Sequence, residues 1–384
     1  MKSNRYEIFL AGSFSVIIAA VPLTQVVLEL SQGERPQAFD VFFRAPTEEH
    51  LRAYESDLED SSWVAQAVRP LARRFHFLAL RDPGSKVLMG RDGWLFYKPR
   101  VDYLVQSSRD DPSHDTGPVA AARAIIRFRD QLASRGIQLL VVPVPCKASV
   151  YPDKLTRRAD DLLLRSRTLE VIAALRAAGV ETVDLFEVFQ ESRETGEGEA
   201  RKSLYLALDT HWSPDGVRKA AEAIAGRIVQ LGWIERGSVQ YRRQAALIER
   251  DGDLVDIMQL PNAQQFFAPE KIRCEQVVLA SHSAAYQDDP NSPVLCLGDS
   301  FSRIYQTDQP GSAGLIAHLA DRLKRPLASI VNDGGASTFV RQQLSRRTEL
   351  LDGKKLVIWE FVESDIRFGA EGWKEVPLPA EPEP

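Results

Sequence analysis

The chain has 384 residues, 44% of them hydrophobic, which is enough for one large or two ordinary domains with a sizeable core. Its formal net charge of -5 disfavours a general nucleic-acid binder, so we expect no nucleic-acid partner. The three cysteines, Cys146, Cys274 and Cys296, are too few for a disulfide framework and fit no zinc spacing. In an oxidising compartment two of them could still form one disulfide.

The N-terminus predicts where the protein resides. The uncharged run from Ile8 to Leu28 is long enough to cross a bilayer, and Lys2 and Arg5 before it should stay in the cytoplasm. No small-x-small cleavage site ends the run, so we favour an uncleaved signal anchor over a removed signal peptide or a buried soluble helix. We therefore expect a single-pass inner-membrane protein, with residues 1–30 as the anchor and the rest of the chain in the periplasm.

Residues 31–85 are expected to form a juxtamembrane helical lead-in. Apolar residues recur at helical spacing from Glu48 to Leu80, and Asp82-Pro83-Gly84-Ser85 predicts a turn after them. The next segment, Val87–Tyr97, has two apolar runs around Gly-Arg-Asp-Gly, which indicates a hairpin.

From about residue 118 the pattern alternates between helices and strands. Fully apolar strands separated by helices indicate a parallel sheet that is covered on both faces. Helices are expected at Val119–Arg135, Ala159–Ala178, Pro214–Leu231 with Ser213 as N-cap, Ser312–Lys324 and Ser337–Leu351, and strands at Ile137–Val144, Val180–Leu185, Val294–Leu297, Leu327–Asn332 and Lys355–Val362. The less regular parts predict a mobile surface loop at Gln190–Lys202, strand pieces at Leu254–Leu260 and Gln276–Ala280, and a disordered tail at 371–384.

A serine follows one of the apolar strands. Gly298-Asp299-Ser300-Phe301-Ser302 comes directly after Val294–Leu297 and is expected to open a helix. This places the Ser300 hydroxyl at a strand-to-helix turn, where backbone N–H groups can hold an oxyanion. Gly-Asp-Ser is also common in ordinary turns and helix caps, so the string is not conclusive alone.

An acid lies two residues before a histidine in Asp209-Thr210-His211-Trp212. In an extended or turning segment the carboxylate reaches the imidazole and fixes its tautomer, so Asp209, His211 and Ser300 are the parts of a nucleophile–base–orienter triad. The alternative is a local hydrogen bond beside a helix. Cys146 is a rival nucleophile with no histidine near it in sequence. A metal bound by Asp209 and His211 lacks a third and a fourth ligand, so we expect no metal.

Sites in such a sheet form at the carboxyl ends of the strands. Asn332 and Gly335 follow one strand end, and together with the Ser300 N–H they are candidates for the oxyanion hole. Lys147 and Tyr151 follow another. We expect Lys147 to meet uronate or hydroxyl groups of an acceptor and Tyr151 to stack on a sugar, unless Tyr151 packs and Lys147 caps a turn. Trp212 is a third candidate substrate contact.

Four short sequence motifs, which lie between about residues 60 and 365, occur in the same order as in a known family. The chain resembles the SGNH-like domain of the AlgJ/AlgX-type alginate O-acetyltransferases at Gly90–Phe96, Pro143–Pro152, Asp209–Gly216 and Gly298–Ser302. The anchor and the helical lead-in fit the AlgJ-like arrangement. Cys146 departs from the small polar residue expected at its position, and no alginate-binding module is evident after the domain, so the polymer stays open.

The resemblance implies a three-layer α/β fold, SGNH-like (flavodoxin-like), with a central parallel sheet in residues 86–370. Its order is permuted, so that the Asp-x-His segment precedes the serine. It implies Ser300 as nucleophile, His211 as base and Asp209 as orienter, with no cofactor. The acetyl group would come from a multipass membrane-bound O-acyltransferase and pass through an acetyl-serine to hydroxyls of an exported polysaccharide. A carbohydrate esterase with the same triad, or a non-catalytic polysaccharide-binding scaffold, stays open.

Overall fold

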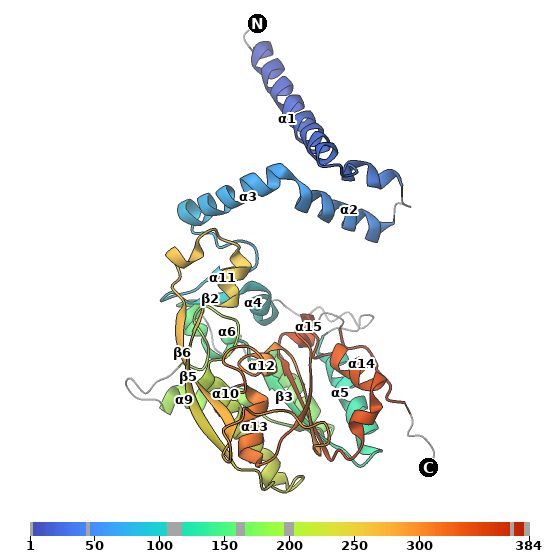
Figure 1. Ribbon diagram of the computed structural model, residues 1–384, viewed down its shortest axis with the longest axis vertical. Helices are drawn as coiled ribbons and strands as arrows, with labels where there is room; N and C mark the ends of the chain where they lie inside the picture. Colours follow the sequence, from blue (N-terminus) through green and yellow to red (C-terminus); the bar gives the residue numbers. More distant parts are fainter. Residues whose placement is uncertain are drawn as a thin grey trace. The chain divides into compact units, whose positions relative to one another are not determined.

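The computed structural model describes residues 3–43, 47–105, 117–158, 166–195, 203–368 and 372–379. The chain forms two compact units, shown in Figure 1. The first comprises Met1–Gly84 together with Gln259–Asn262, and the second comprises Ser85–Met258 and Ala263–Pro384.

The first unit is helical. Its elements are α1 (Ser3–Ser31), η1 (Gln37–Phe42), α2 (Glu48–Ser61), α3 (Trp63–Phe75) and η2 (His76–Leu80). Within α1, Tyr6–Ser31 includes an 18-residue stretch with a mean hydropathy of 1.9, and by length and composition the segment could cross a membrane. Most of its described apolar side chains are exposed, which agrees with the predicted N-terminal span.

A five-stranded parallel sheet forms the centre of the second unit. Its strands are β3 (Gln138–Val144), β4 (Glu181–Thr182), β7 (Val294–Gly298), β8 (Ala328–Val331) and β9 (Leu356–Val362), in the order β4-β3-β9-β7-β8. Every residue of β7 and β9 is buried, as the continuous apolar runs predict for strands covered on both faces. The predicted α/β class with a central parallel sheet is confirmed.

Helices cover both faces of this sheet. In Figure 1, α5 (Pro118–Ala133) and α10 (Pro214–Leu231) lie on opposite sides of β3. The first packs against α8 (Ser166–Ala177), and the second packs between α9 (Leu185–Thr195) and α13 (Leu315–Leu323). Toward the C-terminus α14 (Phe339–Arg346), η5 (Thr348–Leu351) and α15 (Asp365–Phe368) complete the unit. Trp359 of β9 meets Phe128 of α5 edge-on, with 5.3 Å between ring centroids, and anchors this packing.

Two antiparallel pairs flank the sheet. The predicted hairpin is present as β1 (Val87–Met89) and β2 (Leu95–Tyr97), and α4 (Lys98–Val105) follows it. A longer ribbon pairs β5 (Tyr241–Arg250) with β6 (Glu270–Leu279) along their whole length. The prediction at Gln276–Ala280 found only the end of β6.

The strand predicted at Leu254–Leu260 is wrong, because α11 (Asp253–Met258) occupies most of it. Leu254, Val255 and Met258 are its buried side chains, and their spacing of one and three residues places them on one side of a helical turn. This helix begins directly after Gly252, whose φ of 90° lets the chain leave β5 sharply.

Further boundaries differ from expectation, and one prediction lies partly outside the described residues. Residues 190–195 of the predicted mobile loop form the end of α9, and residues 196–202 lie outside the described residues. The described part of the helix predicted at Ala159–Ala178 is α8, which ends at Ala177; the predicted start at 159–165 lies outside the described residues. The prediction of a disordered tail at 371–384 is wrong for residues 372–379. Trp373 is buried, with its ring centroid 5.1 Å from that of Phe361, and the Leu378 N–H donates to Gln131 Oε1. Residues 371 and 380–384 lie outside the described residues.

Candidate active site

The turn between β7 and α12 (Ser300–Arg303) holds Ser300 in a fixed position. Asp299 caps the helix, since its Oδ1 accepts the Phe301 N–H at 2.8 Å and its Oδ2 accepts the Val362 N–H at the end of β9 at 3.0 Å. A Cβ on Gly298 would lie 2.3 Å from Ser302 Oγ, so the tight turn requires glycine there. Ser300 itself is only partly buried and open to solvent.

The segment that carries the histidine folds back on itself before α10. Ser213 N–H donates to Leu204 O at 2.9 Å and Leu206 N–H donates to His211 O at 3.2 Å, which closes a short loop around Asp209 and His211. The Ser213 hydroxyl then accepts from Gly216 N–H and caps α10, with Pro214 in the first turn as predicted.

The structure brings the three predicted triad side chains together. His211 Nε2 lies 2.8 Å from Ser300 Oγ, and His211 Nδ1 lies 2.7 Å from Asp209 Oδ1. An ionised carboxylate only accepts hydrogen bonds, so Nδ1 carries the proton and Nε2 is left to accept from the serine hydroxyl. This is the connectivity of a nucleophile, its general base and the acid that orients the base.

Asp209 remains ionised in this site. It is fully buried, and its Oδ2 accepts from Arg250 Nε at 2.7 Å and from the Asp253 N–H at 3.3 Å. Burial by itself raises the pKa of this carboxyl, but the hydrogen bonds and charges of His211 and Arg250 outweigh it and hold the pKa of Asp209 well below its usual range.

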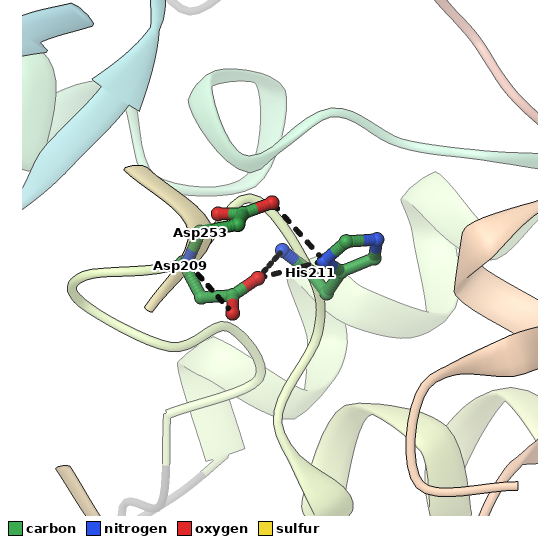
Figure 2. A group of neighbouring side chains, drawn as sticks. All are labelled: Asp209, His211 and Asp253. Atoms are coloured by element: carbon green, nitrogen blue, oxygen red, sulfur yellow. Dashed lines mark hydrogen bonds and ion pairs between the residues drawn. The ribbon is translucent and has the colours of Figure 1, made fainter. Parts of the chain in front are cut away.

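A second carboxylate, Asp253, faces the same imidazole nitrogen, as Figure 2 shows. Its Oδ2 lies 3.4 Å from His211 Nδ1, its Oδ1 accepts the Thr210 N–H at 2.7 Å, and the Thr210 hydroxyl also donates to it. Burial and the nearby charge of Asp209 raise the pKa of Asp253. The ligand atoms of Asp209, His211 and Asp253 lie within 4.8 Å of one another. Both Asp209 oxygens already accept N–H donors, however, so the group fits the orientation of an imidazole better than the coordination of a cation.

Sequence reasoning missed Arg250 and Asp253. They flank the turn between β5 and α11, in the region whose pattern was least regular. The string Arg250-Asp251-Gly252-Asp253 signals a charged turn, but nothing in its spacing connects it with Asp209. Only the path of the β5–β6 ribbon carries Arg250 to Asp209 and Asp253 to His211.

The three residues predicted to form the oxyanion hole differ in whether they can donate a hydrogen bond to an oxyanion. Ser300 is the first residue of α12, so its N–H has no acceptor within the helix and is suited to the role. The prediction for Gly335 is wrong, because its N–H donates to Asn332 O at 3.1 Å. Asn332 follows Val331, the register partner of Gly298, at the same sheet edge, and its role stays a prediction.

Lys147 does not line an acceptor groove, contrary to expectation. It is 4% exposed, and its Nζ donates to the carbonyl oxygens of Leu95, Ala207 and Asp209 at 2.6, 2.7 and 3.1 Å. These bonds use all three ammonium donors. The side chain therefore binds the Asp209 loop from within, and its burial lowers the pKa of Lys147 to about 7.

Tyr151 and Trp212 are also structural, which corrects both predictions. Tyr151 is buried, its hydroxyl accepts the Leu204 N–H at 2.9 Å, and its ring centroid lies 4.7 Å from that of Trp94. Trp212 is fully buried and donates from Nε1 to Phe301 O at 3.1 Å. Neither ring is available to stack on a sugar. Cys146 is not a rival nucleophile, because burial raises the pKa of its thiol well above the usual value.

A cation beside the triad was not anticipated. Arg100 of α4 is half-buried, donates to Thr210 O at 3.2 Å and lies 5.0 Å above the Phe301 ring. It thus touches residues next to both His211 and Ser300. Among the described residues no carboxylate forms an ion pair with it within 4.0 Å, which leaves N–H donors of its guanidinium free for a ligand.

The comparisons with known proteins agree with this site. A family model described as "SGNH hydrolase-like domain, acetyltransferase AlgX" matches residues 87–363. The chain belongs to this family. By this membership it is an acyltransferase with an SGNH hydrolase-like domain, as the resemblance implied.

Individual relatives of this AlgX-family chain are distant. It is similar to a protein named "Probable alginate O-acetylase AlgJ" from Pseudomonas aeruginosa, with 25% identity over 72% of this chain and 69% of the relative. The solved O-acetyltransferase domain of Pseudomonas putida AlgJ has a TM-score of 0.58 at 23% identity, covering 73% of this chain and 91% of that one. Pseudomonas aeruginosa AlgX gives 0.54 at 21% identity over 72% and 61%. These two structures support the fold alone.

Proposed function

We propose that the protein transfers acetyl groups onto hydroxyls of an exported polysaccharide through an acetyl-serine at Ser300. The observation that carries this proposal is the 2.8 Å contact between His211 Nε2 and Ser300 Oγ, with Asp209 on the other ring nitrogen. The acceptor class follows the names of its relatives, which are alginate O-acetylases and an alginate biosynthesis protein.

The reaction takes two displacements at the same serine. Ser300 Oγ attacks the acetyl carbonyl carbon while its proton passes to His211 Nε2, and the Ser300 N–H helps to hold the negative oxygen. The leaving group of the donor takes the proton as the tetrahedral intermediate collapses. A sugar hydroxyl then gives its proton to His211 Nε2 and attacks the carbonyl carbon of the ester. The bond from this carbon to Ser300 Oγ breaks as the second intermediate collapses, and His211 Nε2 returns the proton to Oγ, which frees Ser300.

An N-terminal membrane anchor would keep Ser300 close to an acetyl donor that lies in the membrane. We propose that α1 holds the chain in the inner membrane with the catalytic domain in the periplasm, because the apolar span is preceded by Lys2 and Arg5. A multipass membrane-bound O-acyltransferase would deliver the acetyl group, since acetyl-CoA is cytoplasmic. Residues 31–85 link the span to the catalytic domain.

An acetylated Ser300 is the direct test of this function. When the full chain is mixed with nitrophenyl acetate, mass spectrometry of its peptides should find the acetyl group on Ser300. Adding uronate polysaccharide should then move the label to the polymer faster than water releases acetate. Faster release to water would make the protein an esterase, and an unlabelled Ser300 would favour the scaffold role.

Arg100 is expected to bind the acceptor carboxylate in this reaction. In Arg100→Met, transfer to a uronate polymer should fall by about 10- to 100-fold, because a charge-assisted hydrogen bond contributes roughly 1.5–3 kcal/mol. Cleavage of nitrophenyl acetate and transfer to a neutral glucan should change less than about threefold. The measurement is the initial rate with each acceptor.

Arg242→Met is the matched control, because Arg242 lies exposed on β5 and bonds to Ser283 instead of a triad neighbour. Equal losses with the ester and with both polymers would assign Arg100 to holding Thr210 and Phe301 in position and would contradict acceptor binding.

A further inference from the structure

An exposed apolar stripe runs along α3 and into η2. Val68, Leu71, Phe75 and Leu78 are 52%, 70%, 64% and 48% exposed. Successive members are three or four residues apart, which places them on one side of a helix. Large apolar side chains gathered on one exposed face indicate a surface that something covers.

No other described part of the first unit covers this stripe. The other side of α3 borders a cavity of about 310 Å³ that Gln66, Pro70 and Arg73 line together with Gln259 and nearby residues. The Arg73 guanidinium also donates to the Gln259 side chain. With 100° per residue, Gln66, Pro70 and Arg73 lie roughly opposite Val68, Leu71 and Phe75. The stripe therefore faces away from the segment Gln259–Asn262.

The start of α3 is tied to the last turns of α1. Trp63 N–H donates to Gln25 Oε1 at 3.0 Å, and Gln25 Nε2 donates to Ser61 O at 3.1 Å and to Glu29 at 2.8 Å. Gln25 lies about 9 Å before the end of α1 at 1.5 Å per residue. If α1 spans the bilayer, as the proposed function requires, α3 begins at the depth of the lipid headgroups.

The chemistry of α3 matches that depth. Arg69, Arg73 and Arg74 lie on the same short helix as the stripe, and Trp63 at its start is 40% exposed. An apolar face combined with arginines on the polar part of the same helix is typical of helices that lie in the plane of an anionic membrane surface, and tryptophan favours the same interface.

We propose that α3 lies in the headgroup layer of the bilayer that α1 crosses, with the stripe Val68, Leu71, Phe75 and Leu78 against the acyl chains. Lipid, and not a protein partner, covers the stripe. The chain is then attached to the membrane at two points. The second point limits the rotation of the segment that leads to the catalytic domain.

Site-specific fluorescence tests this proposal on the full chain. The three native cysteines are all buried, so a single introduced cysteine takes an environment-sensitive label. Phe75→Cys reports on the stripe, and Gln66→Cys on the opposite side of the same helix is the control. Both are reconstituted into vesicles of phosphatidylethanolamine and phosphatidylglycerol. The label at 75 should be quenched by spin-labelled lipid and be about fivefold less sensitive to iodide than the label at 66, because the apolar face of such helices is buried about 5–10 Å deep.

Equal iodide quenching at both positions overturns the proposal, and so does protection of position 75 that appears only when a membrane acyltransferase is added to the vesicles. Leu71→Cys repeats the measurement one turn earlier, in case Phe75→Cys disturbs η2. Alkaline carbonate extraction distinguishes a failure of the anchor from a failure of the α3 position. Release of the chain by carbonate contradicts the anchor itself, whereas a retained chain with an iodide-accessible stripe contradicts only the position of α3.

Discussion

Ser300→Ala is expected to lower the rate of nitrophenyl acetate cleavage by about 10⁴-fold or more, since loss of a triad nucleophile removes the covalent route. His211→Ala should cost nearly as much. The double variant should be little worse than either single one, because Ser300 and His211 act as a unit through their 2.8 Å contact. Steady-state kinetics of the three variants and the parent measure this.

Ser302→Ala is the matched control for the nucleophile. The same substitution two residues later removes a hydroxyl that donates to Glu360 at 2.6 Å and does not face His211. It should cost about 1 kcal/mol of stability while most of the activity remains. Activity in Ser300→Ala above a few per cent of the parent, with the fold intact by circular dichroism, would contradict the proposed mechanism.

Asp209→Asn is expected to lower the same rate by about 10²- to 10⁴-fold, because an amide no longer holds the imidazole tautomer in which Nε2 is free to accept. The amide also removes the carboxylate that accepts from Arg250 Nε at 2.7 Å, which leaves Arg250 only the more distant Asp308 at 3.7 Å. Asp253→Asn should cost much less, since Asp253 Oδ2 lies 3.4 Å from His211 Nδ1 and bonds mainly to Thr210. A larger loss in Asp253→Asn than in Asp209→Asn would make Asp253 the orienting acid.

Asp209→Asn is also expected to change how the free energy of unfolding depends on pH. The pKa of Asp209 in the folded state lies well below its value of about 3.9 in the unfolded chain, so its ionised form stabilises the fold fully above that value. The contribution is lost as the pH falls toward the folded-state pKa. Urea unfolding of Asp209→Asn should therefore show a shallower loss of stability below about pH 4 than the parent shows.

Features that depend on neighbouring residues could be predicted from the sequence alone. Asp209 and His211 meet because a two-residue spacing in a tight loop lets the carboxylate reach the ring. Ser300 lies at a strand-to-helix turn because the apolar residues of β7 end at Gly298 and Asp299 caps α12. The central strands were recognisable because strands covered on both faces are apolar along nearly their whole length.

The features that only the tertiary structure decided depend on what packs around each side chain. Lys147, Tyr151 and Trp212 follow or flank site segments, but the backbone carbonyls and rings around them bury them and use their polar atoms. Arg250 reaches Asp209, and Asp253 reaches His211, only because the β5–β6 ribbon ends beside the Asp209 loop. Arg100 reaches Thr210 from α4. Such contacts join segments that lie far apart in the chain. Residue spacing determines only which nearby side chains can meet, so these contacts could not be predicted from a local sequence pattern and depend on how the elements pack.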